Sequence, residues 1–223
     1  LTERLLAGRL HDPFSLLGLR QEGNGYTLRV FNPHASEIWV RRSGAWEALA
    51  RVHPEGLFEW RGPAAPEFPC RIRAHEGAVA REDFDAYCFP PCISSHDLYL
   101  FNEGRLNQAY RTLGAHMMER DGVTGVRFAL WAPNAERVSV VGELNRWDGR
   151  VHPMSVHGSS GVWELFIPGL TPGALYKYEI RNRDTGTVFV KTDPYGQAFE
   201  LRPGTAAKVP HESTHDWQDA LWI

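Results

Sequence analysis

Two stretches of this chain, YTLRVFNPHASEIWV (residues 26–40) and GVRFALWAPNAERVSVVG (residues 125–142), carry one pattern written twice. Each has an aromatic residue, one further residue, a proline, a polar residue and an alanine. The matched pairs are Phe31 with Trp131, Pro33 with Pro133, and Ala35 with Ala135. The repetition indicates two copies of one folding unit.

Two further blocks extend the repeat in the same order. GLFEWRGP (56–63) resembles GVWELFIPGL (161–170), and FDAYCF (84–89) resembles TDPYGQAF (192–199). The matched pairs are Phe58 with Trp163, Glu59 with Glu164, Asp85 with Asp193, and Tyr87 with Tyr195. The offset between copies grows along the chain, as insertions in surface loops would make it do. DPFSLLG (12–18) and QAYRTLG (108–114) both end in Leu-Gly before their copy, so the repeat includes these lead-in segments.

Within each copy, apolar residues alternate with other residues. In the second copy, Val126, Phe128 and Leu130 share one face of a predicted strand. In ALYKYEIR (174–181), Tyr176 and Tyr178 lie opposite Lys177 in the same way. Short period-2 runs separated by Gly and Pro turns are typical of packed antiparallel sheets. The sequence predicts an all-β fold of two tandem immunoglobulin-like antiparallel β-sandwiches with short connecting helices.

The domain boundaries follow from the repeat. We expect the first β-sandwich over 1–95, a connecting helical segment over 96–113, the second β-sandwich over 114–210, and a linker over 211–223. Thr2 is available as the N-cap of a helix at the N-terminus. Leu106, Tyr110 and Leu113 have helical spacing, with Gly114 as the C′ residue. Trp39, Trp60, Trp131 and Trp163 fall inside strand patterns and are predicted to be core residues.

Composition restricts the classes of partner. Hydrophobic residues make up 43% of the chain, and a formal charge of −3 favours neither nucleic acid nor an anionic membrane. No apolar run is long enough to span a bilayer, and no secretory signal is evident. The three cysteines are Cys70, Cys88 and Cys92. Cys88 and Cys92 lack a second ligand pair for zinc, so we predict free thiols, a cytoplasmic protein, and neither metal nor cofactor.

Seven blocks follow one another along the chain: HDPFSLLGLR (11–20), FNPHASEIWV (31–40), LYLFNEGRLNQAYRTLGAH (98–116), GVRFALWAPNAERVSVVGELNRWDGRVHPM (125–154), SGVWELFIPGL (160–170), YKYEI (176–180) and KTDPYG (191–196). In this order they resemble the N-terminal portion of bacterial glycogen branching enzymes, which are glycosyltransferases of the α-amylase superfamily. The resemblance implies a first β-sandwich, a second of carbohydrate-binding module family 48, and then a catalytic barrel. HDWQDALWI (215–223) resembles the linker into that barrel, and its apolar end suggests a truncated chain.

The resemblance also implies a binding site for α-glucans such as glycogen and maltooligosaccharides. In family 48 modules the residue at the end of the GxFNxW block offers a ring to glucose, and Trp147 stands there. Lys177 matches a position that reaches glucose hydroxyls. A second tryptophan, usual just before TDP, is absent, and Phe189 or Val190 occupies that region. Leu144 and Ala86 also depart from the Phe and Pro that the family commonly has.

The residues leave alternatives for each of these roles. Trp147 could instead cover the end of the sandwich, and Lys177 could be an ordinary solvated strand lysine. We expect no catalytic residue, because a retaining mechanism needs two carboxyl groups about 5 Å apart and the barrel that holds them takes about 250 residues. Asp216 and Asp219 have no predicted scaffold. A freestanding glycogen-binding module and a purely structural domain pair remain rival functions to the accessory, glucan-binding region of a branching enzyme.

Overall fold

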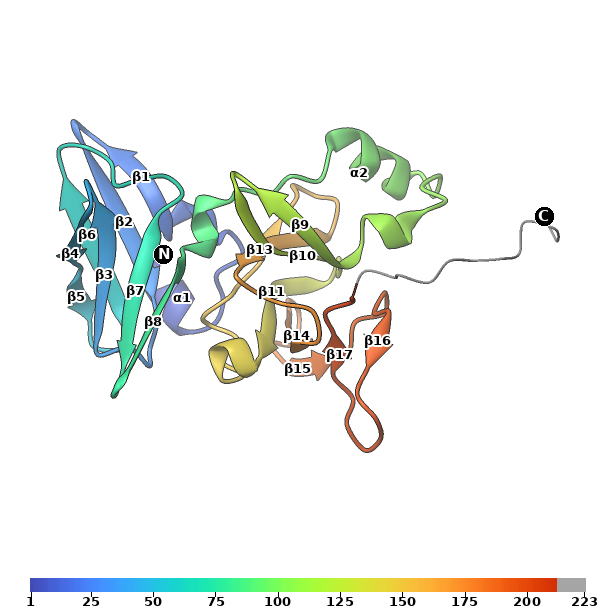
Figure 1. The fold of residues 1–223 in the computed structure, drawn as a ribbon. Helices are drawn as coiled ribbons and strands as arrows, with labels where there is room; N and C mark the ends of the chain where they lie inside the picture. The colour runs from blue at the N-terminus through green and yellow to red at the C-terminus, as the bar shows by residue number, and fades with distance from the viewer. Residues whose placement is uncertain (212–223) are drawn as a thin grey trace.

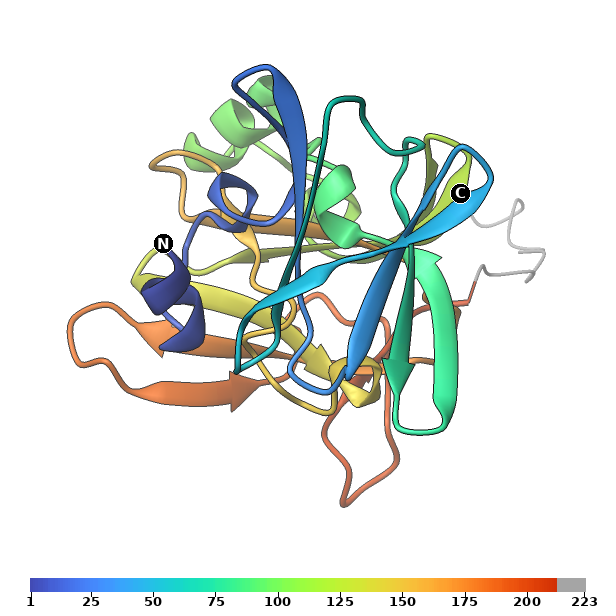
Figure 2. The ribbon, with the colours of Figure 1, turned by 90° about the vertical axis from the view of Figure 1, so that its left-hand side faces the viewer.

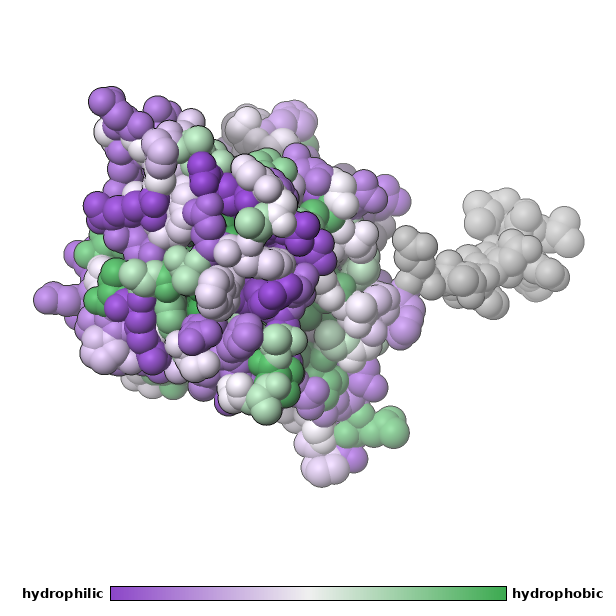
Figure 3. All heavy atoms as spheres, turned by 60° about the vertical axis from the view of Figure 1, so that its left-hand side comes forward, coloured by the Kyte–Doolittle hydropathy of each residue, from purple (hydrophilic) through white to green (hydrophobic). Residues whose placement is uncertain are grey.

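The computed structural model describes residues 1–211, and its first β-sandwich is formed by eight strands. They are β1 (Gly18–Glu22), β2 (Gly25–Phe31), β3 (Glu37–Arg42), β4 (Ala45–Ala48), β5 (Ala50–His53), β6 (Leu57–Gly62), β7 (Arg71–Glu76) and β8 (Val79–Phe84). One sheet has the order β1-β2-β6-β5 and the other β4-β3-β7-β8, with every pair antiparallel. Polar residues dominate the face of the molecule seen in Figure 3, with small apolar patches between them.

The second β-sandwich follows it along the chain (Figure 1). Its strands are β9 (Gly114–Arg120), β10 (Val123–Trp131), β11 (Ala135–Gly142), β12 (Ser155–Val156), β13 (Val162–Pro168), β14 (Leu175–Asn182), β15 (Val188–Lys191), β16 (Ala198–Phe199) and β17 (Ala207–Lys208). One sheet has the order β12-β13-β10-β9, and the other β11-β14-β17-β16, with β15 also paired to β14. The prediction of all-β sandwiches is confirmed.

The helices are short. They are α1 (Thr2–Leu6), α2 (Ser95–Asn102) and the 3₁₀ turns η1 (Pro13–Ser15), η2 (Ala86–Cys88), η3 (Ala109–Arg111) and η4 (Glu143–Asn145). The helix expected over Leu106–Leu113 is not formed as one α-helix: α2 ends at Asn102, and only the 3₁₀ turn η3 includes Tyr110. Ser94 accepts the N–H of Asp97 at 3.0 Å at the start of α2, and Gly104 turns into the left-handed region with φ +68° just past its end. The Thr2 cap is also wrong, since Thr2 lies inside α1 and Leu1 precedes it.

The repeat in sequence is a repeat in structure. Val30 of β2 lies opposite Phe58 of β6, and Leu130 of β10 lies opposite Trp163 of β13. These are equivalent positions of the two copies, one residue before the matched Phe31 and Trp131. The two sandwiches therefore use their matched strands in the same pairing.

A glycine at the same place in each copy explains why the Pro motif recurs. Gly56 has φ +98° and Gly161 has φ +73°. A Cβ on Gly56 would lie 2.5 Å from the Cα of Pro33, and one on Gly161 would lie 2.8 Å from the Cα of Pro133. Only glycine allows the strand connection to come this close. Each approach is closed by a backbone hydrogen bond, from Asn32 to Gly56 (2.9 Å) and from Ala132 to Gly161 (2.8 Å).

The predicted strand faces are confirmed in the second sandwich. Val126, Phe128 and Leu130 are buried, as are Tyr176 and Tyr178. The rings of Phe128 and Tyr176 meet edge to face with centroids 4.9 Å apart. The period-2 pattern thus places the inward residues of both sheets in one core.

The four tryptophans predicted to be core residues divide. Trp60 and Trp163 are buried, and Trp39 is half-buried. Trp131 is 51% exposed, so its assignment to the core was wrong. It ends β10 on the face opposite Leu130, where its ring meets Phe101 of α2 edge-on at 5.9 Å. Alternation places it on the outside of the sheet.

The N-terminal segment packs against the second sandwich, not only the first (Figure 2). Leu5 and Leu10 are buried in the core cluster that contains Val138. Arg9 Nε pairs with Glu136 Oε1 at 2.8 Å. Within residues 1–211 no helix is both long and apolar enough to cross a membrane. The predictions for Asp216, Asp219 and the apolar end at Trp217, Leu221 and Trp222 lie outside the described residues.

Candidate functional site

The turn after β11 holds two successive residues in an unusual backbone conformation. Arg146 has φ +53° and Trp147 has φ +62°, the left-handed region that residues with a Cβ rarely adopt. Such a residue costs about 1–2 kcal/mol and persists only where its surroundings determine it. We name residues 143–150 the Trp147 turn.

Asn145 supplies one of those surroundings from inside the turn. Its side-chain oxygen accepts the N–H of Gly142 at 3.0 Å, and its Nδ2 donates to the carbonyl of Val140 at 2.8 Å and to Nδ1 of His152 at 3.0 Å. The side chain is 96% buried, since only 4% of Asn145 is exposed. Asn145 thus ties the end of β11 to the chain beyond the turn.

The backbone and Asp148 close the turn. The N–H of Trp147 donates to the carbonyl of Gly142 at 2.9 Å, and that of Asp148 donates to Asn145 at 3.0 Å. The Asp148 carboxylate accepts from the N–H, Nε and Nη2 of Arg150 at 2.9 to 3.1 Å. Partial burial raises the pKa of Asp148, but these bonds outweigh it and keep the pKa below its usual value.

A buried arginine lies under the turn. Arg137 of β11 donates to the carbonyl of Gly149 at 2.5 Å and to Ser139 Oγ at 2.7 Å, and it pairs with Glu179 of β14. Gly149 packs so closely over Glu179 that a Cβ would overlap the carboxylate. The turn therefore rests on the outer face of β11 and β14.

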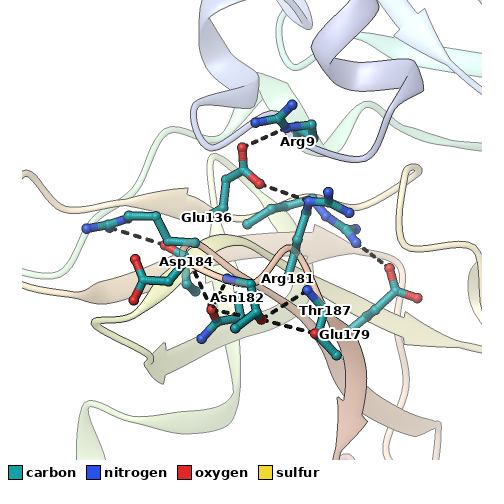
Figure 4. Close-up of polar contacts among 11 residues, drawn as sticks. Arg9, Glu136, Glu179, Arg181, Asn182, Asp184 and Thr187 are labelled. Atoms are coloured by element: carbon teal, nitrogen blue, oxygen red, sulfur yellow. Dashed lines mark hydrogen bonds and ion pairs between the residues drawn. The ribbon is translucent and has the colours of Figure 1, made fainter.

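A charged cluster continues this outer face (Figure 4). Glu136 lies between Arg9 and Arg181, with both Nε–Oε distances at 2.8 Å. Burial raises the pKa of Glu136, but the two arginines hold it below its usual value. The cluster fastens the N-terminal segment beside the turn.

Lys177 lies on the same outer face of β14 as Glu179, and Trp147 lies in the turn whose Gly149 packs over that face. Trp147 is 42% exposed although it is a large ring. Lys177 lies opposite Val141 in the β11–β14 pairing, two residues along β14 from Glu179, and its Nζ donates to Thr205 Oγ1 at 2.6 Å. A polar strand face beside a turn that carries an exposed ring is a candidate site for a ligand with both apolar and hydroxyl surfaces.

The second aromatic position of the predicted site is filled by an aliphatic residue. Val190 lies opposite Glu179, which puts it on the outer face and leaves it exposed. Phe189 lies opposite Ile180 on the other face and is half-buried. Alternation along β15 thus leaves Val190, not Phe189, beside the outer charges.

Residues of the first sandwich reach the turn, which the sequence reasoning missed. Arg146 pairs with Glu76 at 2.6 Å, and Arg150 pairs with Glu55 at 2.8 Å. Just beyond the turn, the hydroxyl of Tyr87 donates to the carbonyl of Pro153 at 3.1 Å. No periodicity links residues so far apart in sequence, and only the placement of the sandwiches brings them together.

Cys88 and Cys92 bond to different carboxyl groups. Cys88 Sγ donates to Asp85 at 3.7 Å, and Cys92 Sγ donates to Glu164 at 3.2 Å. Among residues 1–211 there is no group of three or more His, Cys, Asp or Glu side chains that could hold a metal ion.

Comparison with known proteins places these features in a class. Residues 112–196 match the family model of carbohydrate-binding module 48, the isoamylase N-terminal domain. The second sandwich, with its Trp147 turn, is thus a module of this class.

The rest of the chain specifies the family. Residues 2–87 match the model of the N-terminal domain of α-1,4-glucan branching enzyme GlgB. Similar relatives are the 1,4-α-glucan branching enzymes GlgB of Methylobacillus flagellatus (59% identical), Nitrosospira multiformis (57%) and Nitrosomonas europaea (56%). Each alignment covers 98% of this chain and 30% of the relative. The chain belongs to the 1,4-α-glucan branching enzyme (GlgB) family. It corresponds to the N-terminal region and spans about 30% of the length of these relatives.

Proposed function

We propose that this chain binds α-glucan at the Trp147 turn. In this proposal it acts as the glucan-binding N-terminal region of a 1,4-α-glucan branching enzyme. The observation that supports this most is the strained, fully bonded turn that keeps a large ring exposed. A ring that merely covered the end of the sandwich would gain most from burial. Backbone strain of this kind gathers at ligand sites, where it is part of a preformed geometry.

The chemistry of the outer face fits a sugar chain. A glucose ring presents C–H groups on its faces and hydroxyls at its edge, so an indole can stack on the face while a charged group bonds the edge. We assign the stacking to Trp147 and the hydroxyl contact to Lys177. On binding, the Lys177 ammonium group gives up its hydrogen bond to Thr205 and donates to a sugar hydroxyl instead. Because Val190 stands where a second aromatic ring would be, only one face of the glucose ring stacks on an aromatic side chain in this site.

The transfer reaction belongs to the rest of the enzyme in this proposal. Branching moves an α-1,4-linked chain to form an α-1,6 branch, and it needs two carboxyl groups held about 5 Å apart on a rigid scaffold. We assign that chemistry to the catalytic barrel expected beyond this segment, since the relatives are much longer. The role of this segment is to hold glucan near that barrel.

Calorimetric titration with maltoheptaose tests the glucan site. Loss of one stacked ring is worth about 1.5 kcal/mol, so Trp147→Ala should raise Kd about tenfold or more. Trp131→Ala is the matched control, because Trp131 is a comparably exposed tryptophan on the other sheet, 51% against 42% for Trp147. Equal Kd values for the parent and Trp147→Ala, or no binding by the parent, would leave a purely structural domain pair as the function.

A further inference from the structure

The two arginines that flank Trp147 in sequence both pair with the other sandwich. Arg146, directly before the tryptophan, pairs with Glu76 Oε2 at 2.6 Å. Arg150, three residues after it, pairs with Glu55 Oε2 at 2.8 Å. The turn is therefore held on both sides of its exposed ring by side chains that belong to a different domain.

The two glutamates come from separate parts of the first sandwich, one from a strand end and one from a turn. Glu76 ends β7, and its Oε1 accepts a hydrogen bond from Asn32 at 3.2 Å. Glu55 lies in the turn between β5 and β6, which the N–H of Gly56 closes on the carbonyl of His53 at 3.0 Å. The Glu76 side chain is thus held within the first sandwich, whereas Glu55 extends from a closed turn and its side chain is 51% exposed.

We propose that Glu55 and Glu76 are positioning residues for glucan binding, so that the first sandwich is a working part of a site whose contacts all lie in the second. This inference rests on the proposed function of the Trp147 turn. The glutamates do not touch the sugar. They act by holding Arg146 and Arg150, and through them the angle at which Trp147 meets the glucose ring.

The physical reason is the conformation of the turn. Two successive left-handed residues are a high-energy arrangement, and the free turn has lower-energy alternatives. Restraining the bound conformation before the ligand arrives lowers the entropic cost of binding. The bonds of Asn145, Arg137 and Asp148 restrain the turn from within the second sandwich, whereas the two ion pairs restrain Arg146 and Arg150 from the first sandwich.

Removing the carboxylate charges tests the inference. We expect Glu55→Gln and Glu76→Gln each to raise the Kd for maltoheptaose about two- to fivefold, as the loss of one partly exposed ion pair does. The double variant should raise it about tenfold. Glu82→Gln is the matched control, since Glu82 pairs with Arg73 at 2.5 Å in the same sandwich but away from the turn. Its Kd should equal that of the parent, and all variants should unfold at similar temperatures.

Two further readouts separate positioning from general stability. Glucan is uncharged, so salt can weaken binding only through charges within the protein. Raising KCl should increase the Kd of the parent toward that of the double variant and leave the double variant unchanged. Exchanging the charges, with Glu76→Arg and Arg146→Glu combined, should restore part of the affinity that Glu76→Arg alone loses.

The outcomes distinguish this inference from the proposed function. If Trp147→Ala weakens binding but the double glutamate variant binds like the parent, the positioning role is wrong and the glucan site stands. If Glu82→Gln weakens binding as much as Glu76→Gln, the effect is one of total charge and the inference is again wrong. If Trp147→Ala has no effect, the proposed function fails, and the positioning role with it.

Discussion

The Asn145 side chain donates a hydrogen bond to Nδ1 of His152 at 3.0 Å. The amide orientation is determined by its other partners, because Oδ1 accepts from Gly142 and Nδ2 also donates to Val140. Nδ1 of His152 must then be an acceptor, so the ring is neutral with its proton on Nε2. The Trp147 turn therefore depends on an uncharged histidine.

Acid should weaken the protein through this histidine. Burial lowers the pKa of His152 from its usual value near 6.5 to about 4. The unfolded chain binds a proton between these values and the folded chain does not, so stability is lost as pH falls below 6.5. From pH 7.5 to 5 we expect a loss of about 1–2 kcal/mol from this group. Urea unfolding of His152→Gln, whose amide oxygen still accepts from Asn145, should show a smaller loss. An equal loss in parent and variant would contradict this assignment.

Raising the pH from 4 to 7 should also lower the stability of the protein, through a buried carboxyl group. Burial raises the pKa of Asp85 to about 7, although the N–H of Tyr87 and the thiol of Cys88 partly offset the effect. The folded chain holds this proton between pH 4 and 7 while the unfolded chain releases it, so stability falls as pH rises through this range. Asp85→Asn should remove about 2 kcal/mol of the difference in unfolding free energy between pH 5 and 8. If the variant and the parent lose stability in parallel over that range, Asp85 is ionised in the folded protein.

Asp193 should be a stability residue of the second sandwich. Its Oδ2 accepts the hydroxyls of Tyr176 and Tyr178 at 2.7 and 3.2 Å, and its Oδ1 accepts the N–H of Tyr195 at 2.8 Å. Asp193→Ala leaves two buried hydroxyls without an acceptor and should cost about 2–4 kcal/mol in thermal or urea unfolding. Asp193→Asn keeps a carbonyl oxygen and should cost less. Equal costs for the two variants would show that the hydroxyl bonds contribute little.

Short sequence patterns predicted the structural features that depend on residues close together in the chain. The repeat with Pro33 and Pro133 predicted two sandwiches, and alternation predicted the buried faces of β10 and β14. Asp193 stands directly before a proline, an arrangement typical of a turn, and its Oδ1 accepts the N–H of Tyr195 in such a turn. These features depend on side-chain period and turn chemistry, which a short stretch contains.

What the sequence did not predict depends on distant parts of the chain. Trp131 stands among apolar residues in the sequence, yet its position in β10 places its side chain on the outer face of the sheet. The hydrogen bonds from Tyr176 and Tyr178 to Asp193 could not be predicted, because they form only where β14 packs against the segment that contains Asp193. The pairs Arg146–Glu76 and Arg150–Glu55 join the two domains, and no pattern within either copy contains them. Trp147 and Lys177 were named from the family resemblance, and their binding role stays a prediction.

The indole N–H signals of this chain test glucan binding at Trp147 most directly. The chain has eight tryptophans, and Trp147→Ala identifies the signal of Trp147 by its disappearance. On titration with maltoheptaose, followed by ¹H–¹⁵N correlation NMR, the Trp147 signal should shift more than any other, in a saturable manner. A titration in which the Trp147 signal stays in place, or in which the largest shift belongs to another tryptophan such as Trp131, would contradict the account.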